Sequence, residues 1–154
     1  MPAHKFKRWG TRALMDYEAL RRELTRDEGR RKRPYRCTAG KLTIGVGWNL
    51  EDQDLPERII DDLLDVAIAR AESEALVCFP NLHELSERRQ RVLVNMALNL
   101  GPRLRKFLQL RKAIAQEDYV KAVAEMEDSK WALPVDQGGV GPRAERLMRM
   151  MEQG

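Results

Sequence analysis

The chain has 154 residues, which is enough to bury the core of one domain or of two small lobes. Its 28 Lys and Arg outnumber its 24 Asp and Glu, and the net charge of +4 suits a polyanionic partner without selecting one. Two cysteines are too few for a disulfide scaffold, and no run of about 18 apolar residues indicates a membrane span.

Residues 1–12, MPAHKFKRWGTR, form a basic tail without the apolar run of a signal peptide. We therefore expect a protein that is made and held in the cytoplasm, with neither a signal peptide nor a transmembrane segment. The simplest interpretation of this tail is a poorly ordered terminus. An arm that touches a wall or a membrane is the alternative.

An amphipathic helix is predicted after the tail and ends at Gly29. Tyr17, Leu20 and Leu24 form an apolar stripe at helical spacing, and Glu28 takes the next position on that stripe. A carboxyl group at a core-facing helix end is partly desolvated, which favours the protonated form that general acid catalysis requires.

The residue types after this helix predict a β-hairpin. Its arms are residues 33–37 and 41–46, joined by the three-residue loop Thr38-Ala39-Gly40 with glycine at the left-handed position. This register puts Cys37 and Thr43 on one polar face. Glycines on the same face suit a ligand that approaches the backbone closely. Spacing alone, however, favours an ordinary surface ribbon packed on a helix.

Most of the chain beyond the hairpin is predicted to be helical. One long or two shorter amphipathic helices begin after Pro56 and end at residues 79–81. The most apolar helix, the expected centre of a larger lobe, runs from its N-cap Ser86 to Leu100 and stops at residues 101–102.

The last third of the chain continues this helical pattern. Apolar faces over residues 104–114 and 119–126 predict two short helices, and Trp131 is expected to be buried after them. Residues 136–141 are a flexible loop by composition, and Pro142 starts a last helix. Methionines on these helices are expected to fill the core. The fold class is therefore α+β and mostly helical.

Other chemistries have less support in the sequence. His4 and His83 have no paired Cys/His spacing, so a zinc site is not expected, and Cys78 is most simply a small buried hydrophobe. Residues 45–47 lack the third glycine and the strand-turn-helix context of a phosphate loop. A Cys-His peptidase would need His83 to reach Cys37 across the fold. A nucleic-acid-binding domain would need a basic stripe with interleaved aromatic residues.

An ordered set of motifs runs from about residue 14 to residue 150. Eight residues separate Glu28 from Cys37 and five separate Cys37 from Thr43, in a stretch that also holds Tyr35 and the TIGVG run. Further motifs are RVLVNMALNLG at 91–101, Phe107, DSKW at 128–131 and PRA at 142–144. Together they resemble the phage lysozymes (endolysins) of glycoside hydrolase family 24, the T-even type, whose Glu, Asp-or-Cys, Thr spacing they match. This resemblance outweighs the interpretation as a plain surface ribbon.

The resemblance implies a single lysozyme-like domain over residues 1–154. A small hairpin lobe at about 27–60 would hold the active site. A long helix at about 61–78 would join it to a larger helical lobe at about 80–154. We expect the protein to be a monomer.

The resemblance also implies the chemistry, which is cleavage of the β-1,4 bond between N-acetylmuramic acid and N-acetylglucosamine in bacterial peptidoglycan. Glu28 would be the general acid, and Thr43 with Cys37 would position the attacking water, giving inversion at the anomeric carbon. This reaction needs no cofactor and no metal, and no nucleic acid is expected as a partner. The substrate-binding candidates are Tyr35, Gly47, Asn99, Phe107 and Arg143.

Two of these candidates, Asn99 and Arg143, also have ordinary structural interpretations. Asn95 and Asn99 lie four apart on one flank of their helix, and amides in such places commonly cap or make core hydrogen bonds. In the family, an amide at the position of Asn99 faces the substrate. Arg143 would contact the wall or form a salt bridge with Glu145 or Glu28.

The chain departs from the T-even pattern in three places. Cys37 stands where those enzymes carry Asp, Trp48 stands where they carry a His paired with an Asp, and the segment 49–57 is shortened. A free thiol has a pKa of about 8.5, and the nearby cations Arg33, Arg36 and Lys41 favour partial ionisation of Cys37.

The implied biology is host cell lysis by a phage or prophage enzyme. Without an export signal, the protein would stay in the host cytoplasm until a membrane-permeabilising holin released it to the periplasm and the wall. The alternative function is a glycan-binding lysozyme-like module without catalysis, against which the presence of Glu28 and Thr43 argues.

Overall fold

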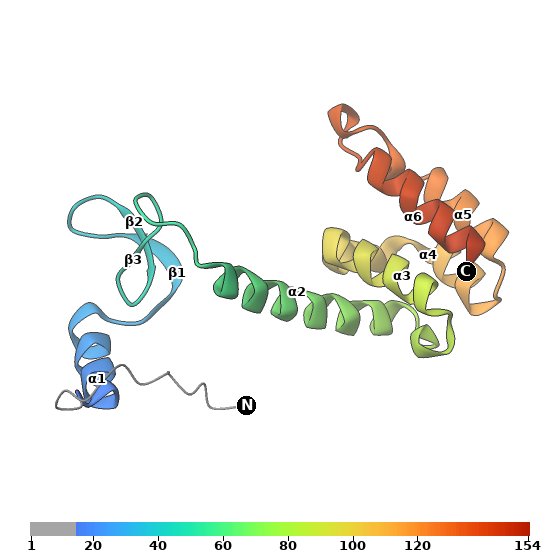
Figure 1. The fold of residues 1–154 in the computed structure, drawn as a ribbon. Helices are drawn as coiled ribbons and strands as arrows, with labels where there is room; N and C mark the ends of the chain where they lie inside the picture. The colour runs from blue at the N-terminus through green and yellow to red at the C-terminus, as the bar shows by residue number, and fades with distance from the viewer. Residues whose placement is uncertain (1–14) are drawn as a thin grey trace. The chain divides into compact units, whose positions relative to one another are not determined.

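The computed structural model describes residues 15–154, and the chain divides into two compact units after Pro56. The predicted basic tail, residues 1–12, lies outside the described residues. Figure 1 shows a small sheet in the first unit and helices throughout the second. The fold is mostly helical with one antiparallel sheet, so the predicted α+β class is confirmed.

Helix α1 (Tyr17–Glu28) opens the N-terminal unit. The carboxylate of its N-cap, Asp16, accepts hydrogen bonds from two backbone N–H groups at 2.9 and 3.0 Å, and Gly29 with φ 72° ends the helix. No residue of α1 is buried, and Tyr17 and Leu24 remain 67% and 46% exposed. The predicted core-facing stripe is therefore wrong, because nothing in the N-terminal unit packs over it.

The sheet has the strand order β1-β2-β3. Strand β2 (Leu42–Gly45) is central and pairs antiparallel with both β1 (Arg31–Arg36) and β3 (Trp48–Asn49), so β1 is an edge strand. The pairing slips along β1, where four steps of the chain face two steps of β2. The sequence did not predict β3, because two residues are too few to show an alternating pattern.

The loop between β1 and β2 has the predicted length. The N–H of Cys37 donates to the carbonyl of Lys41 at 3.0 Å, and the N–H of Gly40 donates to the carbonyl of Cys37 at 2.8 Å. Gly40 has φ 78°, as expected for a glycine in the left-handed position. The three-residue hairpin loop is therefore confirmed.

The C-terminal unit begins with α2 (Glu57–Cys78), a continuous helix of 22 residues. It ends before Phe79, as predicted, and the single turn η1 (Leu82–Glu84) follows. Helix α3 (Glu87–Leu100) begins where the hydroxyl of Ser86 accepts a hydrogen bond from a backbone N–H at 3.3 Å. Both of its predicted ends are confirmed.

The predicted short helix over residues 104–114 is two elements, η2 (Gly101–Lys106) and α4 (Leu108–Ala115). Phe107 separates them because its φ of −80° and ψ of 61° are not helical. The remaining elements are α5 (Tyr119–Glu127), η3 (Lys130–Ala132), η4 (Val135–Gln137) and α6 (Pro142–Gln153).

The segment 136–141, predicted to be a flexible loop, is held by the backbone around it. Three backbone hydrogen bonds of 2.9–3.1 Å tie residues 139–141 to residues 131–134. A Cβ atom on Gly139 would lie only 1.9 Å from the carbonyl oxygen of Leu133. Glycine at this position permits close backbone packing.

The hydrophobic core belongs to the C-terminal unit. Helix α2 packs on α3, α3 on α6, and α5 on both α4 and α6. Met96, Met126 and Met151 are buried, which confirms the prediction that methionines fill the core, and Cys78 is buried beside them. Among residues 15–56, Thr43 is the only buried residue.

Candidate active site

Five of the predicted site residues lie within the N-terminal unit. Their arrangement relative to one another is therefore set by that unit alone. They are Glu28 at the end of α1, Tyr35 on β1, Cys37 at the start of the hairpin loop, Thr43 on β2 and Gly47 after β2.

The carboxylate of Glu28 lies against Gly47. A Cβ atom on Gly47 would be 3.4 Å from Oε2 and 3.7 Å from Cδ of Glu28. Gly47 also has φ 74°, a conformation that L side chains rarely adopt. The backbone conformation thus favours glycine here, and the carboxylate of Glu28 lies within van der Waals contact of this position. Glu28 itself is exposed, so the predicted desolvation of this carboxyl group is wrong.

The hairpin gathers Tyr35, Cys37 and Thr43 on one face of the sheet. Tyr35 lies directly opposite Thr43, and Cys37 is two residues beyond Tyr35 on the same strand path. Thr43 is only 3% exposed, and its hydroxyl donates to the carbonyl of Lys41 at 3.0 Å. The thiol and the hydroxyl thus share the face that the hairpin register predicts.

The pKa of the Cys37 thiol is lowered from its ordinary value. The backbone N–H of Ala39 has the largest effect and that of Lys41 the next, because both stabilise the thiolate. Partial burial opposes this shift, and the Thr43 hydroxyl adds a smaller lowering. The turn itself therefore favours an anion at this position.

Two of the three cations that the sequence suggested as the cause of ionisation pair with carboxylates. Lys41 pairs with Asp52 at 2.9 Å, and Arg36 pairs with Glu51 at 3.4 Å. The lowered pKa of Cys37 is thus correct in direction, but its principal cause is backbone hydrogen bonding.

Trp48 is a candidate that the sequence analysis missed. It lies on β3, and its indole N–H is buried without a hydrogen-bond partner among the described residues. An unpaired buried donor costs about 1–3 kcal/mol. This N–H therefore lacks a partner within the fold, and the only sequence signal was a tryptophan where the T-even enzymes carry histidine.

The remaining candidates lie in the C-terminal unit and have structural partners there. The amide oxygen of Asn99 accepts the indole N–H of Trp131 at 3.1 Å. Arg143 donates from Nε and Nη2 to the amide oxygen of Asn95 at 2.8 and 2.6 Å, in place of the expected pairing with Glu145. These bonds tie α3 to η3 and to α6.

Trp131 and Phe107 both belong to the packed interior of this unit. Trp131 is 5% exposed, as predicted, and half-buried Phe107 packs against the core. The amide oxygen of Asn99 is occupied, whereas its NH₂ group donates no hydrogen bond within residues 15–154. Asn99 therefore retains free donors for a ligand, as does Arg143, whose Nη1 makes no hydrogen bond within the same residues.

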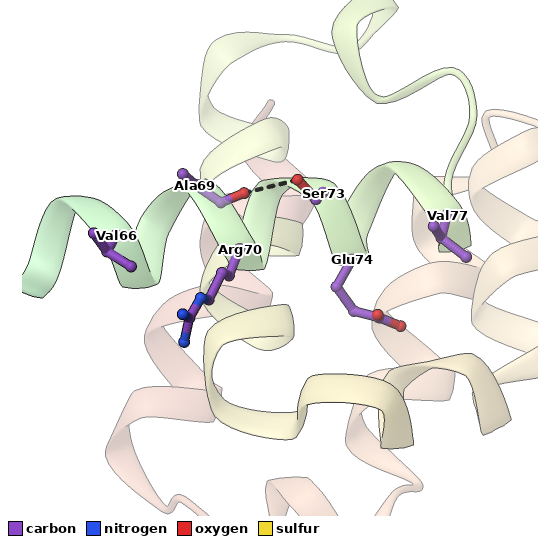
Figure 2. Close-up of a pocket in the computed structure, with 6 residues that line it drawn as sticks. All are labelled: Val66, Ala69, Arg70, Ser73, Glu74 and Val77. Carbon is purple, nitrogen blue, oxygen red and sulfur yellow. Dashed lines mark hydrogen bonds between the residues drawn. The ribbon is translucent and has the colours of Figure 1, made fainter. Parts of the chain in front are cut away.

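A shallow hollow on α2 contains none of the predicted site residues. All of its lining side chains come from one face of that single helix, and Ser73 donates to the carbonyl of Ala69 at 2.9 Å (Figure 2). Glu74, at its edge, makes two hydrogen bonds with Arg105. The hollow has no opposing wall of reactive groups.

Within the described part of the chain, no group of three or more His, Cys, Asp and Glu is placed to hold a metal ion. Over the same residues, no helix combines the length and the apolar character needed to cross a membrane.

The N-terminal unit thus combines a helix that ends in a carboxylate with a small sheet that carries a thiol and a threonine hydroxyl, and the C-terminal unit is helical. The family model of phage lysozymes matches residues 25–145, a range that includes all eight predicted site residues. The chain therefore belongs to the phage lysozyme family and is a peptidoglycan hydrolase of the endolysin kind. No curated protein matches the chain.

Proposed function

We propose that this phage lysozyme is an N-acetylmuramidase of the T-even type, glycoside hydrolase family 24, with Cys37 in place of the catalytic Asp. It cleaves the β-1,4 bond between N-acetylmuramic acid and N-acetylglucosamine. The observation that supports this proposal best is the Glu28 carboxylate, exposed and held against Gly47 in the same unit as Cys37 and Thr43.

Glu28 acts as the general acid. Its carboxylic proton passes to the glycosidic oxygen as the bond from that oxygen to the anomeric carbon breaks. The side chain is accessible to a sugar because it lies at the helix end, where Gly29 turns the chain away. Gly47 leaves space beside the carboxylate because it has no side chain of its own.

Cys37 and Thr43 position the attacking water on the opposite face of the sugar. The thiolate, favoured by the N–H groups of Ala39 and Lys41, stabilises the positive charge that develops on the ring. It also accepts a hydrogen bond from the water and takes up its proton as the new carbon–oxygen bond forms. Thr43 supports the thiolate from the same face of the hairpin.

Water attack without a covalent intermediate gives inversion. Inverting enzymes hold their two groups about 6.5–9.5 Å apart, so that a water fits between the second group and the sugar. The first product is therefore the α-anomer, which proton NMR of a fresh digest identifies. If the β-anomer appears first, a covalent intermediate replaces this mechanism.

The remaining predicted site residues bind substrate in this proposal. Tyr35 and Gly47 contact the sugars next to the reacting groups, and the free NH₂ group of Asn99 donates to an N-acetyl oxygen. Phe107 supports the surface that carries Asn99, and Arg143 contacts the wall. The enzyme acts as a monomer without a cofactor, and a holin releases it from the host cytoplasm to the wall.

Lysis of chloroform-treated Gram-negative cells, followed as loss of turbidity, tests the function. The native protein should lyse these cells, whereas Glu28→Gln should lose on the order of 10²–10⁴-fold because an amide cannot donate the proton. Asp27→Asn is the matched control, since Asp27 is the adjacent exposed acid and pairs only with Arg26 among the described residues.

Three outcomes are informative. Lysis by folded Glu28→Gln within tenfold of the native rate would remove Glu28 from the mechanism. An equal loss in Asp27→Asn would show a general charge effect. Binding of native protein to the wall without lysis would select a glycan-binding module.

A further inference from the structure

Strand β1 concentrates positive charge in the N-terminal unit. Five exposed cations fall within seven residues: Arg30, Arg31, Lys32, Arg33 and Arg36. Among residues 15–154, only Arg36 of these five has an ion-pair partner, the exposed Glu51 at 3.4 Å. The guanidinium of Arg31 lies 5.5 Å from the ring centre of Tyr35. The three others have no carboxylate partner in the described part of the chain.

In the sequence, these cations lie between the two proposed reacting residues, Glu28 and Cys37. Arg30 is two residues after Glu28, and Arg36 directly precedes Cys37. Between them, β1 is the edge of the sheet and pairs on one side only, with β2. A ligand that engages these side chains would therefore lie next to the site.

Edge strands often carry charges and proline, which prevent pairing with another strand. Here Pro34 already removes one backbone donor from the edge. Five cations of one sign go beyond this protective role, because like charges so close together repel one another and oppose the compact state. Such an arrangement is stabilised when an anionic partner binds.

We propose that β1 binds the carboxylates of the short peptides attached to the glycan strands of peptidoglycan. This inference rests on the proposed function, which places the glycan at Glu28 and Cys37. The N-acetylated sugars of that glycan are neutral, so the negative charge next to the cleaved bond belongs to the peptide that each muramic acid carries. Arginine suits this partner because its guanidinium can bind a carboxylate through two hydrogen bonds.

The strength of this contact should depend on salt. Each pair is solvent-exposed, so it contributes little by itself, and screening over about 10 Å at 0.1 M ionic strength weakens it. The combined effect of several pairs makes the contact measurable.

Binding of soluble, uncross-linked glycan chains tests the proposal. The probes are chains that carry their peptides and the same chains stripped of peptides by an amidase and then amidated at the lactyl carboxylate that this cleavage exposes. The protein is the full chain with Glu28→Gln, which should not cleave them. We compare it with the same protein carrying Lys32→Gln and Arg33→Gln. The matched control carries Lys121→Gln and Arg149→Gln, two exposed cations of the C-terminal unit.

We expect peptide-bearing chains to bind more tightly than stripped chains at 50 mM salt. The β1 variant should weaken binding of the peptide-bearing chains by about three- to tenfold, and the loss should shrink at 300 mM salt. The control variant should leave the ratio of the two Kd values unchanged.

Equal Kd values for the two chains, or an equal change of that ratio in the control variant, would overturn the proposal and leave only edge protection for these cations. Release of reducing ends from peptide-bearing chains by native protein separately tests the proposed function. Charge-dependent binding without cleavage would retain the inference and reject the catalytic role of this site.

Discussion

Replacing Gly47 by alanine should impair catalysis by more than its effect on stability explains. The added Cβ would sit 3.4 Å from Oε2 of Glu28, in ordinary van der Waals contact, so the carboxylate keeps its place only if nothing else shifts. The φ of 74° favours such a shift, because a left-handed residue with a side chain costs about 1–2 kcal/mol. The backbone that relaxes is the one that supports Glu28.

The expected loss follows from how catalysis depends on position. A misplacement of about 1 Å can lower the rate by roughly 10²-fold, so a shift of a few tenths of an ångström should lower kcat/KM by about tenfold. Release of reducing ends from soluble glycan chains gives kcat/KM. Amide hydrogen exchange in β2 gives the free energy of opening of the hairpin.

Gly45→Ala is the matched comparison. Gly45 has φ 69° in the same hairpin, but a Cβ atom there would meet nothing within 4 Å. Both variants should therefore destabilise the hairpin by similar amounts, and Gly47→Ala should lose several times more kcat/KM. Equal losses of kcat/KM at equal folded fraction would show that the contact between Gly47 and Glu28 does not position the acid.

Four further predictions concern Cys37, Asn99 and Gly139. Cys37→Asp should lyse cells faster than Cys37→Ala, since it restores an anion, and the reverse ranking with both variants folded would make Cys37 a structural residue. Because the pKa of Cys37 is lowered, its thiolate persists to lower pH than that of a free thiol. The rate of alkylation by iodoacetamide should therefore reach half its plateau value at a lower pH than for a free thiol. A midpoint at or above that of a free thiol would contradict this. Asn99→Ala should lower the free energy of unfolding by about 1–3 kcal/mol, because it leaves the indole N–H of Trp131 unpaired. Asn99→Asp keeps an acceptor and should unfold in urea near the native midpoint. Equal midpoints for both variants would show that this hydrogen bond contributes little. Gly139→Ala should lower the thermal midpoint by well over 10 °C, because its Cβ would overlap the carbonyl of Leu133, and a near-native midpoint would show that this backbone yields easily.

Local signals in the sequence were sufficient for most element boundaries. Ser86 and Gly101 bound α3 as predicted because a cap depends on the few residues beside it. The hairpin loop was predictable for the same reason, since Gly40 alone fixes its left-handed position. The motif spacing likewise predicted which residues meet on one face of the hairpin.

The sequence was insufficient where a property depends on contacts between distant segments. The stripe on α1 has a helical period, but burial requires a surface to pack against, which the N-terminal unit does not supply. Gly139 looked like a source of flexibility because Leu133 is its neighbour only in space. Composition also pointed to cations beside Cys37, whereas the turn aims backbone N–H groups at its sulfur.

The same limit applies to the candidate site. Arg143 and its partner Asn95 are 48 residues apart, so no local pattern could pair them. The unpaired indole N–H of Trp48 is a property of its surroundings in the folded unit, and β3, the strand that carries it, was too short to predict.

The uneven distribution of the core has a consequence for how the enzyme tolerates heat. Within residues 15–154, all buried apolar residues lie between Ala71 and Met151, so the unit that holds Glu28, Cys37 and Thr43 depends mainly on the hydrogen bonds of its helix and its hairpin. A segment with little buried apolar surface opens at a lower free-energy cost than the core does. On warming, lytic activity should therefore fade while the helical circular dichroism signal is still intact, and it should return on cooling. The N-terminal unit would then lose its active structure at a lower temperature than the helical C-terminal unit.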